Sequence, residues 1–444
     1  MEMSPYVLSK SLPEGEVYFN TKNNHSFFIT NELLRKIDCD DTTRSQYNDY
    51  LESWHYHQEE NELEETLAKI KNVDEKLLEF TILTHGDCNF RCKYCYEKFE
   101  NISMSLEVED AIVTFADKLL SEGKFERFSV QWFGGEPLLG YKTIVRLSAR
   151  FLELCTMYNI EYFSGITTNG YLLNKHMFQN LVENCKVTGY QITVDGEREF
   201  HDNQRLLKNG VGSYDRIFAN LKMMGASSLH FHCTIRFNIS KENVESMEHF
   251  LKLDGLVFRE DSRFSLAYHN IGDWGQGERA DDYCVDIPNG DYSYYCYQRA
   301  VALGYCIDGP QTMMLNSINC YANRKQHYMF NVKGVIQSCT VALYRKENIF
   351  GSVLTGVVNE NKRNDWLKGI ELERCSQCPY VLLCKSGYCP LVRINQEKSW
   401  ERLCRLYKER IQKDFLLFIL TRSYNDILDI NYFFGGSNND YKRK

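Results

Sequence analysis

The chain has 444 residues, of which 43% are hydrophobic and 25% are charged, so its composition is that of a folded globular protein with two or three domains, not a disordered or fibrous one. Its formal net charge of −8 argues against a nucleic-acid-binding surface, because such surfaces concentrate Lys and Arg to neutralise phosphates. No segment reaches the roughly 18 apolar residues of a membrane span, and the N-terminus lacks a basic region followed by an apolar run, so we expect a cytoplasmic protein without a signal peptide.

Residues 1–78 predict a small α+β domain. Val17–Asn20 and Ser26–Thr30 alternate in polarity around a turn-like segment, which is typical of a β-hairpin. A helix is expected to begin at Asn31, and the Glu-rich residues 59–77 carry apolar side chains near helical spacing.

Residues 79–280 alternate between short apolar runs and longer amphipathic segments. The predicted strands are Phe80–Thr84, Phe128–Phe133, Tyr162–Thr167, Gly189–Val194, Leu229–Phe237 and Arg263–His269. The helices predicted between them cover residues 107–121, 141–157, 174–184, 213–224 and 241–252. This alternation indicates parallel βαβ units. Because there are six strands and not the eight of a closed TIM barrel, we expect an α/β fold with a partial (β/α)6 barrel, whose functional residues follow the carboxyl ends of the strands.

The remainder of the chain is less regular. Residues 281–319 are rich in Tyr, Asp and Gly and are interpreted as a bridge region. Residues 320–422 contain seven cysteines and little periodicity, as expected where metal clusters replace a hydrophobic core. Residues 423–444 are expected to form a mobile tail.

The seventeen cysteines are more typical of metal ligands or buried thiols than of disulfides if the protein is cytoplasmic. Cys88, Cys92 and Cys95 follow the first predicted strand, and their spacing allows one loop to ligate three irons of a cubane cluster. The fourth iron would then be open to a small molecule. A zinc knuckle with His85 as its fourth ligand is the alternative.

Polar and glycine-containing segments follow the next three strands. Gly135 and Glu136 follow the second strand, Asn169 follows the third, and Thr193 lies in the fourth, twelve residues before Arg205. Glycine lets a backbone approach a ligand closely, a carboxylate can meet a cation, and arginine pairs well with a carboxylate. Each segment taken alone is also typical of an ordinary strand-to-helix turn.

The cysteine spacing, with Tyr94 before the last cysteine, resembles the signature of the radical S-adenosylmethionine (SAM) superfamily, and the later segments resemble its GGEP, TNG and S-x-DG motifs. The resemblance implies a [4Fe–4S] cluster on Cys88, Cys92 and Cys95, whose open iron binds SAM and cleaves it reductively to methionine and a 5′-deoxyadenosyl radical. It also implies SAM contacts by Tyr94, Gly135, Glu136, Asn169, Thr193 and Arg205. Phe133 stands where many relatives have Gln.

The later cysteines resemble a SPASM domain, a C-terminal extension that carries two auxiliary [4Fe–4S] clusters in peptide-modifying radical SAM enzymes. By that resemblance one auxiliary cluster is held by Cys375, Cys378, Cys384 and Cys404. The other is held by Cys320, Cys339 and Cys389, with Cys306 as a candidate fourth ligand. Four residues separate Cys384 from Cys389 where three are usual. A pair of structural zinc sites is the alternative.

The resemblance favours a maturase that crosslinks a ribosomally made precursor peptide through a C–S, C–C or C–O bond. It implies SAM, three [4Fe–4S] clusters and an external one-electron reductant such as flavodoxin or ferredoxin. We expect no nucleic-acid or membrane partner, because of the negative net charge and the lack of a long apolar segment. Sulfatase maturases carry Asp after the cysteine that matches Cys339, where this chain has Thr340. They also begin close to the first cysteine motif, whereas residues 1–78 precede it here and are expected either to bind a leader peptide as an added strand or to form a structural lid.

Two alternative functions stay open from the sequence. One is formylglycine formation by a sulfatase-maturase-like enzyme. The other is a non-catalytic iron–sulfur module that relays electrons or binds a peptide.

Overall fold

The computed structural model describes residues 2–272, 292–308, 320–367, 372–384, 389–395, 399–421 and 424–430. Contacts divide the chain into two units. Unit 1 comprises residues 1–73, 310–320 and 369–444, and unit 2 comprises residues 74–309 and 321–368. None of the described helices is both long enough and apolar enough to cross a membrane.

Unit 2 contains six parallel strands that neighbour one another in chain order. They are β4 (Leu77–Leu83), β5 (Arg127–Phe133), β6 (Glu161–Thr168), β7 (Val187–Thr193), β8 (His232–Ile239) and β9 (Phe264–Asn270). Each begins within three residues of its predicted start, and the predicted α/β fold with a partial barrel is confirmed. The apolar runs predicted these strands because parallel strands covered on both faces need little polar surface.

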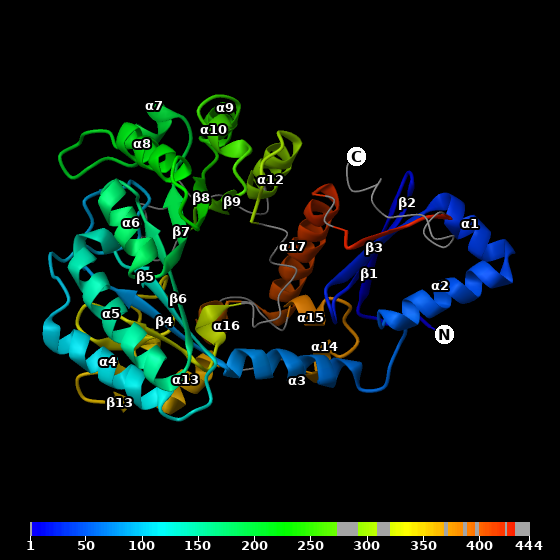
Figure 1. The fold of residues 1–444 in the computed structure, drawn as a ribbon, viewed down its shortest axis with the longest axis horizontal. Helices are drawn as coiled ribbons and strands as arrows, with labels where there is room; N and C mark the ends of the chain where they lie inside the picture. Colours follow the sequence, from blue (N-terminus) through cyan, green and yellow to red (C-terminus); the bar gives the residue numbers. More distant parts are fainter. Residues whose placement is uncertain are drawn as a thin grey trace. The chain divides into compact units, whose positions relative to one another are not determined.

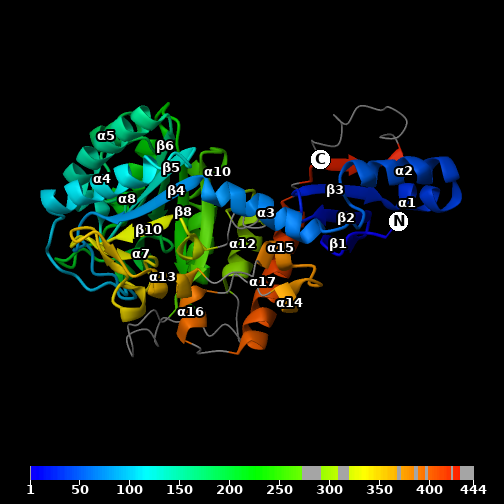
Figure 2. The same cartoon turned by 90° about the horizontal axis from the view of Figure 1, so that it is seen from below.

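Helices cover the outer face of these strands, as Figures 1 and 2 show for α4 and α5. The connecting helices are α4 (Leu106–Leu120), α5 (Tyr141–Tyr158), α6 (Lys175–Glu183), α7 (Arg198–Gln204), α8 (Tyr214–Gly225), α9 (Val244–Lys252) and α10 (Leu256–Arg259), with a 3₁₀ turn, η1, at Pro137–Gly140. Helix α4 begins after Ser105, whose side chain caps the Val108 amide. Val108, Ile112 and Ala116 recur every four residues on its buried face, so the helix packs against the sheet.

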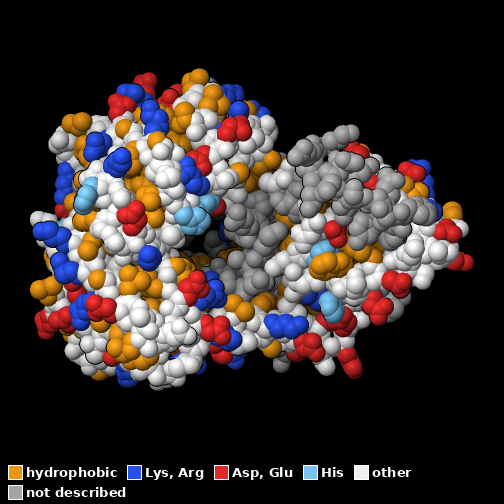
Figure 3. Space-filling model, in the orientation of Figure 1, with side chains coloured by type: hydrophobic (Ala, Val, Ile, Leu, Met, Phe, Trp, Pro, Cys, Tyr) orange, Lys and Arg blue, Asp and Glu red, His pale blue; other side chains and the backbone are white. Residues whose placement is uncertain are grey.

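The sheet of unit 2 continues beyond β4 into the cysteine-rich part of the chain. Strand β10 (His327–Phe330) pairs parallel to β4, and short antiparallel strands follow it: β11 (Val335–Gln337), β12 (Gly351–Ser352) and β13 (Val357–Val358). Unit 2 also contains α12 (Tyr292–Ala302), α13 (Glu360–Trp366), η3 (Tyr321–Asn323) and η4 (Lys346–Asn348). Of the predicted bridge region, only residues 292–308 are described. Figure 3 shows charged side chains of both signs interspersed on the visible face of this unit.

Unit 1 is built on a four-stranded sheet in the order β1-β2-β3-β14. Strands β2 (Gly15–Asn20) and β3 (His25–Thr30) form the predicted hairpin, and β1 (Val7–Leu12) pairs antiparallel with β2. The fourth strand, β14 (Asp426–Leu428), pairs parallel with β3. The expectation of a mobile tail is therefore wrong for Asp426–Leu428, because these residues pair with a strand about 400 positions earlier; residues 431–444 lie outside the described part of the chain.

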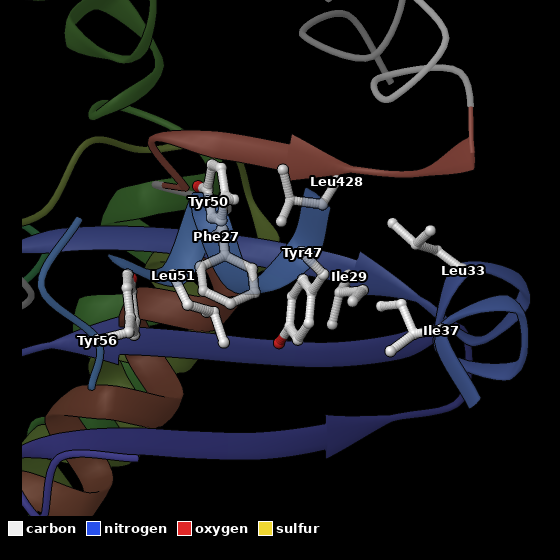
Figure 4. Close-up of a cluster of buried hydrophobic side chains, with 9 residues drawn as sticks. All are labelled: Phe27, Ile29, Leu33, Ile37, Tyr47, Tyr50, Leu51, Tyr56 and Leu428. Atoms are coloured by element: carbon white, nitrogen blue, oxygen red, sulfur yellow. The ribbon is translucent and has the colours of Figure 1, made fainter. Parts of the chain in front are cut away.

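Helices cover both faces of this sheet. Helices α1 (Asn31–Cys39) and α2 (Asp41–Ser53) are capped by Thr30 and Asp40 and enclose one apolar cluster (Figure 4). Helix α17 (Trp400–Leu420) packs on the other face, where the Phe19 and Phe418 ring centroids are 5.3 Å apart. The remaining helices of unit 1 are α14 (Leu372–Cys375), α15 (Val381–Cys384) and α16 (Pro390–Asn395). Helix α3 (Glu62–Glu75) leads from the first unit into the second.

Candidate functional site

The loop after β4 carries Cys88, Cys92 and Cys95. Asp87, at the start of this loop, stabilises it through three contacts. The Asp87 carboxylate accepts the Cys88 amide at 2.8 Å and pairs with Arg91 at 3.0 Å and with Lys208. His85, the candidate ligand of the zinc alternative, already accepts the Asp87 amide through Nδ1 at 3.0 Å. Burial lowers the pKa of His85, so the ring is neutral at pH 7.

The loops after β5 and β6 meet the cysteine loop. A Cβ atom on Gly135 would lie 2.5 Å from the Asp87 carbonyl oxygen, so only glycine permits this approach. The Glu136 amide donates to the same oxygen at 3.1 Å. Asn169 Nδ2 lies 3.7 Å from Cys88 Sγ and donates to Asn89 Oδ1 at 2.8 Å. Three segments that the sequence keeps apart are therefore joined at Cys88.

Glu136 is fully buried and ties the ends of two strands together. Its carboxylate accepts the Thr168 hydroxyl at 2.7 Å, the Asn169 amide at 2.8 Å and the Leu138 amide at 2.9 Å. Burial raises the pKa of Glu136, and these three donors oppose the shift. Since a carboxylate offers about four acceptor positions, one is left for a further donor.

Tyr94 lies at the centre of a buried polar network. Its hydroxyl donates to Asp195 and accepts from Arg205 Nη1 at 2.6 Å and from Asn238 Nδ2 at 3.0 Å. Arg205 and Asp195 are 3.8 Å apart and both are buried. Burial raises the pKa of Asp195, and the Arg205 guanidinium opposes this. Sequence reasoning did not identify Asn238, whose only signal was its position near the end of β8.

The three thiols are in surroundings that suit an iron–sulfur cluster. Burial raises the pKa of each of them, that of Cys95 to about 12, so they ionise only if a compensating positive charge is present. Cys88 Sγ accepts the Phe90 amide at 3.3 Å, a type of bond that tunes cluster potentials. In the described part of the chain, no three His, Cys, Asp or Glu side chains converge as they would around a single metal ion.

Two buried donors at this site lack a hydrogen-bond partner among the described residues. They are Arg205 Nε and Asn89 Nδ2. A buried donor without an acceptor is costly, so each is suited to meet an acceptor on a bound molecule. Thr193, the last residue of β7, has a buried side chain at the same end of the sheet.

Glu97 is a titratable group that the sequence did not single out. It comes two residues after Cys95, and burial raises its pKa to about 7, with a smaller contribution from the Glu136 carboxylate. A carboxyl group with such a pKa can hold or release a proton near neutral pH.

Four of the later cysteines share one cavity in unit 1. Its lining includes Cys375, Cys378, Cys384 and Cys404. These come from α14, α15, the turn between them and α17, so residues up to 29 positions apart in the sequence reach one space. They are the four residues predicted for one auxiliary cluster. Trp400 and Tyr407 complete much of the wall.

The other predicted ligand set is divided between the two units. In unit 1 the Cys389 amide donates to the Tyr407 hydroxyl at 3.1 Å, and burial, Cys389 and Cys320 all raise the pKa of Tyr407, to about 12. In unit 2 the Cys339 amide donates to Asn348 at 3.0 Å, and Cys306 is exposed.

Thr340, which follows Cys339, is buried beside Tyr321. The two hydroxyl oxygens are 2.7 Å apart, and the Thr340 amide donates to the Tyr321 hydroxyl at 3.2 Å. Residue 340 therefore supplies a hydroxyl group that is already hydrogen-bonded to Tyr321, and not the carboxylate expected of a sulfatase maturase.

The profile of the radical SAM superfamily matches residues 81–253. A cysteine-type anaerobic sulfatase-maturating enzyme of Clostridium perfringens is 22% identical over 354 residues, which cover 74% of this chain and 93% of that enzyme. The corresponding enzyme of Clostridium novyi is 26% identical over 186 residues, covering 40% of this chain and 47% of that enzyme.

Two solved structures share the fold. The structure of anSMEcpe with bound AdoMet has a TM-score of 0.54 at 18% identity and covers 78% of this chain and 95% of its own. Streptococcus suis SuiB bound to the precursor peptide SuiA has a TM-score of 0.50 at 15% identity and covers 90% of this chain and 98% of its own.

Proposed function

Since residues 81–253 are a radical SAM domain, as the sequence predicted, we propose that this enzyme is a peptide maturase that binds a [4Fe–4S] cluster and SAM and crosslinks a precursor peptide. The observation that carries the proposal is the meeting of the three strand-end loops at Cys88, where Gly135 and Asn169 contact the cysteine loop. When bound, the cluster and SAM supply a radical able to abstract a hydrogen atom from the peptide.

The chain's own residues bind and orient these groups. Cys88, Cys92 and Cys95 would hold the cluster. SAM would be held by Tyr94, Gly135, Glu136, Asn169, Thr193 and Arg205. Arg205 is suited to the SAM carboxylate because its Nε is buried without an acceptor, while Tyr94 and Asp195 fix the rest of its guanidinium.

The auxiliary clusters are part of the same proposal. Cys375, Cys378, Cys384 and Cys404 line one cavity and would hold one cluster, while Cys320, Cys339 and Cys389 would hold the other. Forming one crosslink removes one hydrogen atom, one proton and one electron from the peptide. An auxiliary cluster would accept that electron. The separate electron needed to cleave SAM would come from an external one-electron reductant such as flavodoxin or ferredoxin.

Two observations favour a peptide maturase over formylglycine formation. Thr340 is hydrogen-bonded to Tyr321 where sulfatase maturases have a carboxylate. The likeness to SuiB, which was solved with a precursor peptide, extends over 90% of this chain, against 78% for anSMEcpe. Residues 1–78 would then supply the sheet that receives the leader segment.

Formylglycine formation is the second candidate, and the relatives named as sulfatase-maturating enzymes favour it. Conversion of the cysteine in a sulfatase-derived peptide to formylglycine, with no crosslink in a precursor peptide, would establish this alternative.

The first step is tested by incubating reduced, cluster-loaded protein with SAM. We expect 5′-deoxyadenosine and methionine, and their absence would reject the proposed chemistry. The Cys88→Ala/Cys92→Ala/Cys95→Ala variant should produce neither. Cys39→Ala, which removes an exposed cysteine elsewhere, is the matched control and should retain activity.

A further inference from the structure

Two segments at the carboxyl end of the parallel strands lie against each other. Residues 87–93, the first part of the cysteine loop, run antiparallel to residues 204–210. The Arg91 amide donates to the Leu206 carbonyl oxygen at 2.8 Å. In such an extended pair, successive side chains point to opposite faces. The paired segments therefore have an inner face and an outer face.

The inner face is closed to a partner protein. Phe90 is 1% exposed, and its ring centroid lies 5.8 Å from that of Tyr171. The Tyr94 hydroxyl bonds to the buried Arg205 guanidinium on the same side. Because Tyr94 and Arg205 are also proposed to contact SAM, a protein that delivers an electron has to approach from the outer face.

The exposed charges of the paired segments are all positive. The side chains of Arg91 and Lys208 are 40% and 44% exposed, and Lys93 is exposed as well. The one side-chain carboxylate within these two segments, that of Asp87, is 5% exposed and faces Arg91 and Lys208. In a chain with a net charge of −8, this local excess of positive charge favours an acidic partner.

A hollow of about 380 Å³ lies beside these positive charges. Asp87 and Asn89, which flank Cys88, both line it. Leu139, which is 38% exposed, and Leu207 add apolar surface to its wall. An apolar centre with a polar rim is typical of protein–protein interfaces. Because electron transfer slows steeply with distance, a carrier seated over this hollow is well placed to reduce a cluster held by Cys88.

A small anion fits this surface less well than an acidic protein does. Arg91 and Lys208 are both paired with the Asp87 carboxylate, which would repel an anion bound between them. A protein surface is wide enough to reach Lys93 as well and to cover the two leucines of the hollow.

We propose that the hollow lined by Leu139 and Leu207, with the three exposed cations beside it, is the docking site of an acidic one-electron carrier protein of the flavodoxin or ferredoxin type. One electron passes from the carrier to the cluster on the cysteine loop, and no bond forms or breaks in this step. The identity of the partner rests on the proposed function, because that cluster is the electron acceptor. The location of the surface rests on the charges and the hollow.

The test compares a protein reductant with a small one. Full-length, cluster-loaded protein without SAM is titrated with an acidic flavodoxin in a calorimeter. Electron transfer from reduced flavodoxin is then followed by the absorbance of its flavin. Wild-type binding should weaken as the salt concentration is raised, because salt screens the attraction between surface charges. Dithionite is the second reductant, since a small anion needs no docking surface.

Leu139→Glu introduces a negative charge into the hollow. It should weaken flavodoxin binding about tenfold and slow electron transfer from flavodoxin, while reduction by dithionite stays as in the wild type. Lys93→Gln removes one exposed cation and should weaken flavodoxin binding about threefold. The matched controls are Leu256→Glu, at a leucine of α10 that is 43% exposed, and Lys118→Gln, at an exposed lysine of α4. Both controls should bind flavodoxin as the wild type does.

Lys93→Gln guards against misfolding of the first variant, because it changes only an exposed side chain. The proposal would be overturned by equal flavodoxin affinity in the wild type, Leu139→Glu and Lys93→Gln. Failure of the wild type to bind flavodoxin, or an equal loss of affinity in Leu256→Glu, would overturn it too.

The two proposals fail separately. Flavodoxin binding that depends on Leu139 and Lys93, in a protein that does not cleave SAM, would reject the radical chemistry and leave the docking surface standing. Dithionite-driven SAM cleavage in a protein whose flavodoxin affinity is indifferent to both residues would do the reverse.

Discussion

Replacing Asp195 with Asn tests whether the buried network around Tyr94 holds the cysteine loop in place. Asp195 accepts the Tyr94 hydroxyl and, through Oδ1, the Asn238 amide at 3.0 Å. It is also the carboxylate that faces Arg205. Asparagine preserves the shape but removes the charge, and it must place an NH₂ group where one oxygen accepted a hydrogen bond.

The loss of unfolding free energy expected for Asp195→Asn depends on how deeply the ion pair is buried. Asp195 is fully buried and the Arg205 side chain is 7% exposed, so the variant leaves a guanidinium without a counter-charge away from solvent. Removing one partner of a buried ion pair costs about 3–5 kcal/mol. Because Asn keeps one acceptor oxygen for Asn238, we expect a loss near the lower limit, about 3 kcal/mol of the free energy of unfolding.

The assay is urea unfolding monitored by circular dichroism, combined with iron content after anaerobic reconstitution. Asp195→Asn should unfold at a lower urea concentration and retain less iron, since Tyr94 lies between two of the proposed ligands. Asp215→Asn is the control, because Asp215 and Arg198 form an ion pair in which both side chains are more than 60% exposed, so the change should be within about 1 kcal/mol. A variant with the wild-type urea midpoint and full iron content would refute the reasoning.

Three further predictions concern other parts of the chain. Gly135→Ala places a Cβ atom 2.5 Å from the Asp87 carbonyl oxygen and should abolish SAM cleavage. Gly123→Ala is the control, because there is open space around Gly123. It should keep the activity and lower the free energy of unfolding by only about 1 kcal/mol, as measured by thermal unfolding. Burial lowers the pKa of His327 to about 3, so below about pH 6.5 the unfolded chain binds a proton at this residue that the folded chain does not bind. The free energy of unfolding should therefore fall as the pH decreases, and between pH 6.5 and 5 the wild type should lose about 2 kcal/mol more than His327→Gln. The same pH dependence of the unfolding free energy in both proteins would contradict this. Cys384→Ser should lose about four irons per chain in a colorimetric iron assay, and Cys39→Ser none; equal iron contents would reject the cavity as a cluster site.

The sequence by itself determined the barrel strands and the order of the site segments. Strands such as Leu77–Leu83 are short apolar runs bounded by turns and followed by amphipathic helices, and this local pattern is sufficient to predict parallel βαβ units. The carboxyl ends of parallel strands lie at one edge of a sheet, so the sequence alone places the residues that follow each strand in one group. The cysteine spacings predicted which residues bind iron–sulfur clusters.

Only the tertiary structure decided which groups touch. Asn238 joins the Tyr94 network, and Glu97 is buried beside a second carboxylate, because strands distant in sequence converge there. Strand β14 could not be predicted from its three residues: neither Asp426 nor Leu428 has a local pattern that specifies a strand, and both acquire their contacts from β3 and α2, nearly 400 residues earlier. Local periodicity specifies an element, whereas its partner is selected by shape and charge that exist only after the chain has folded.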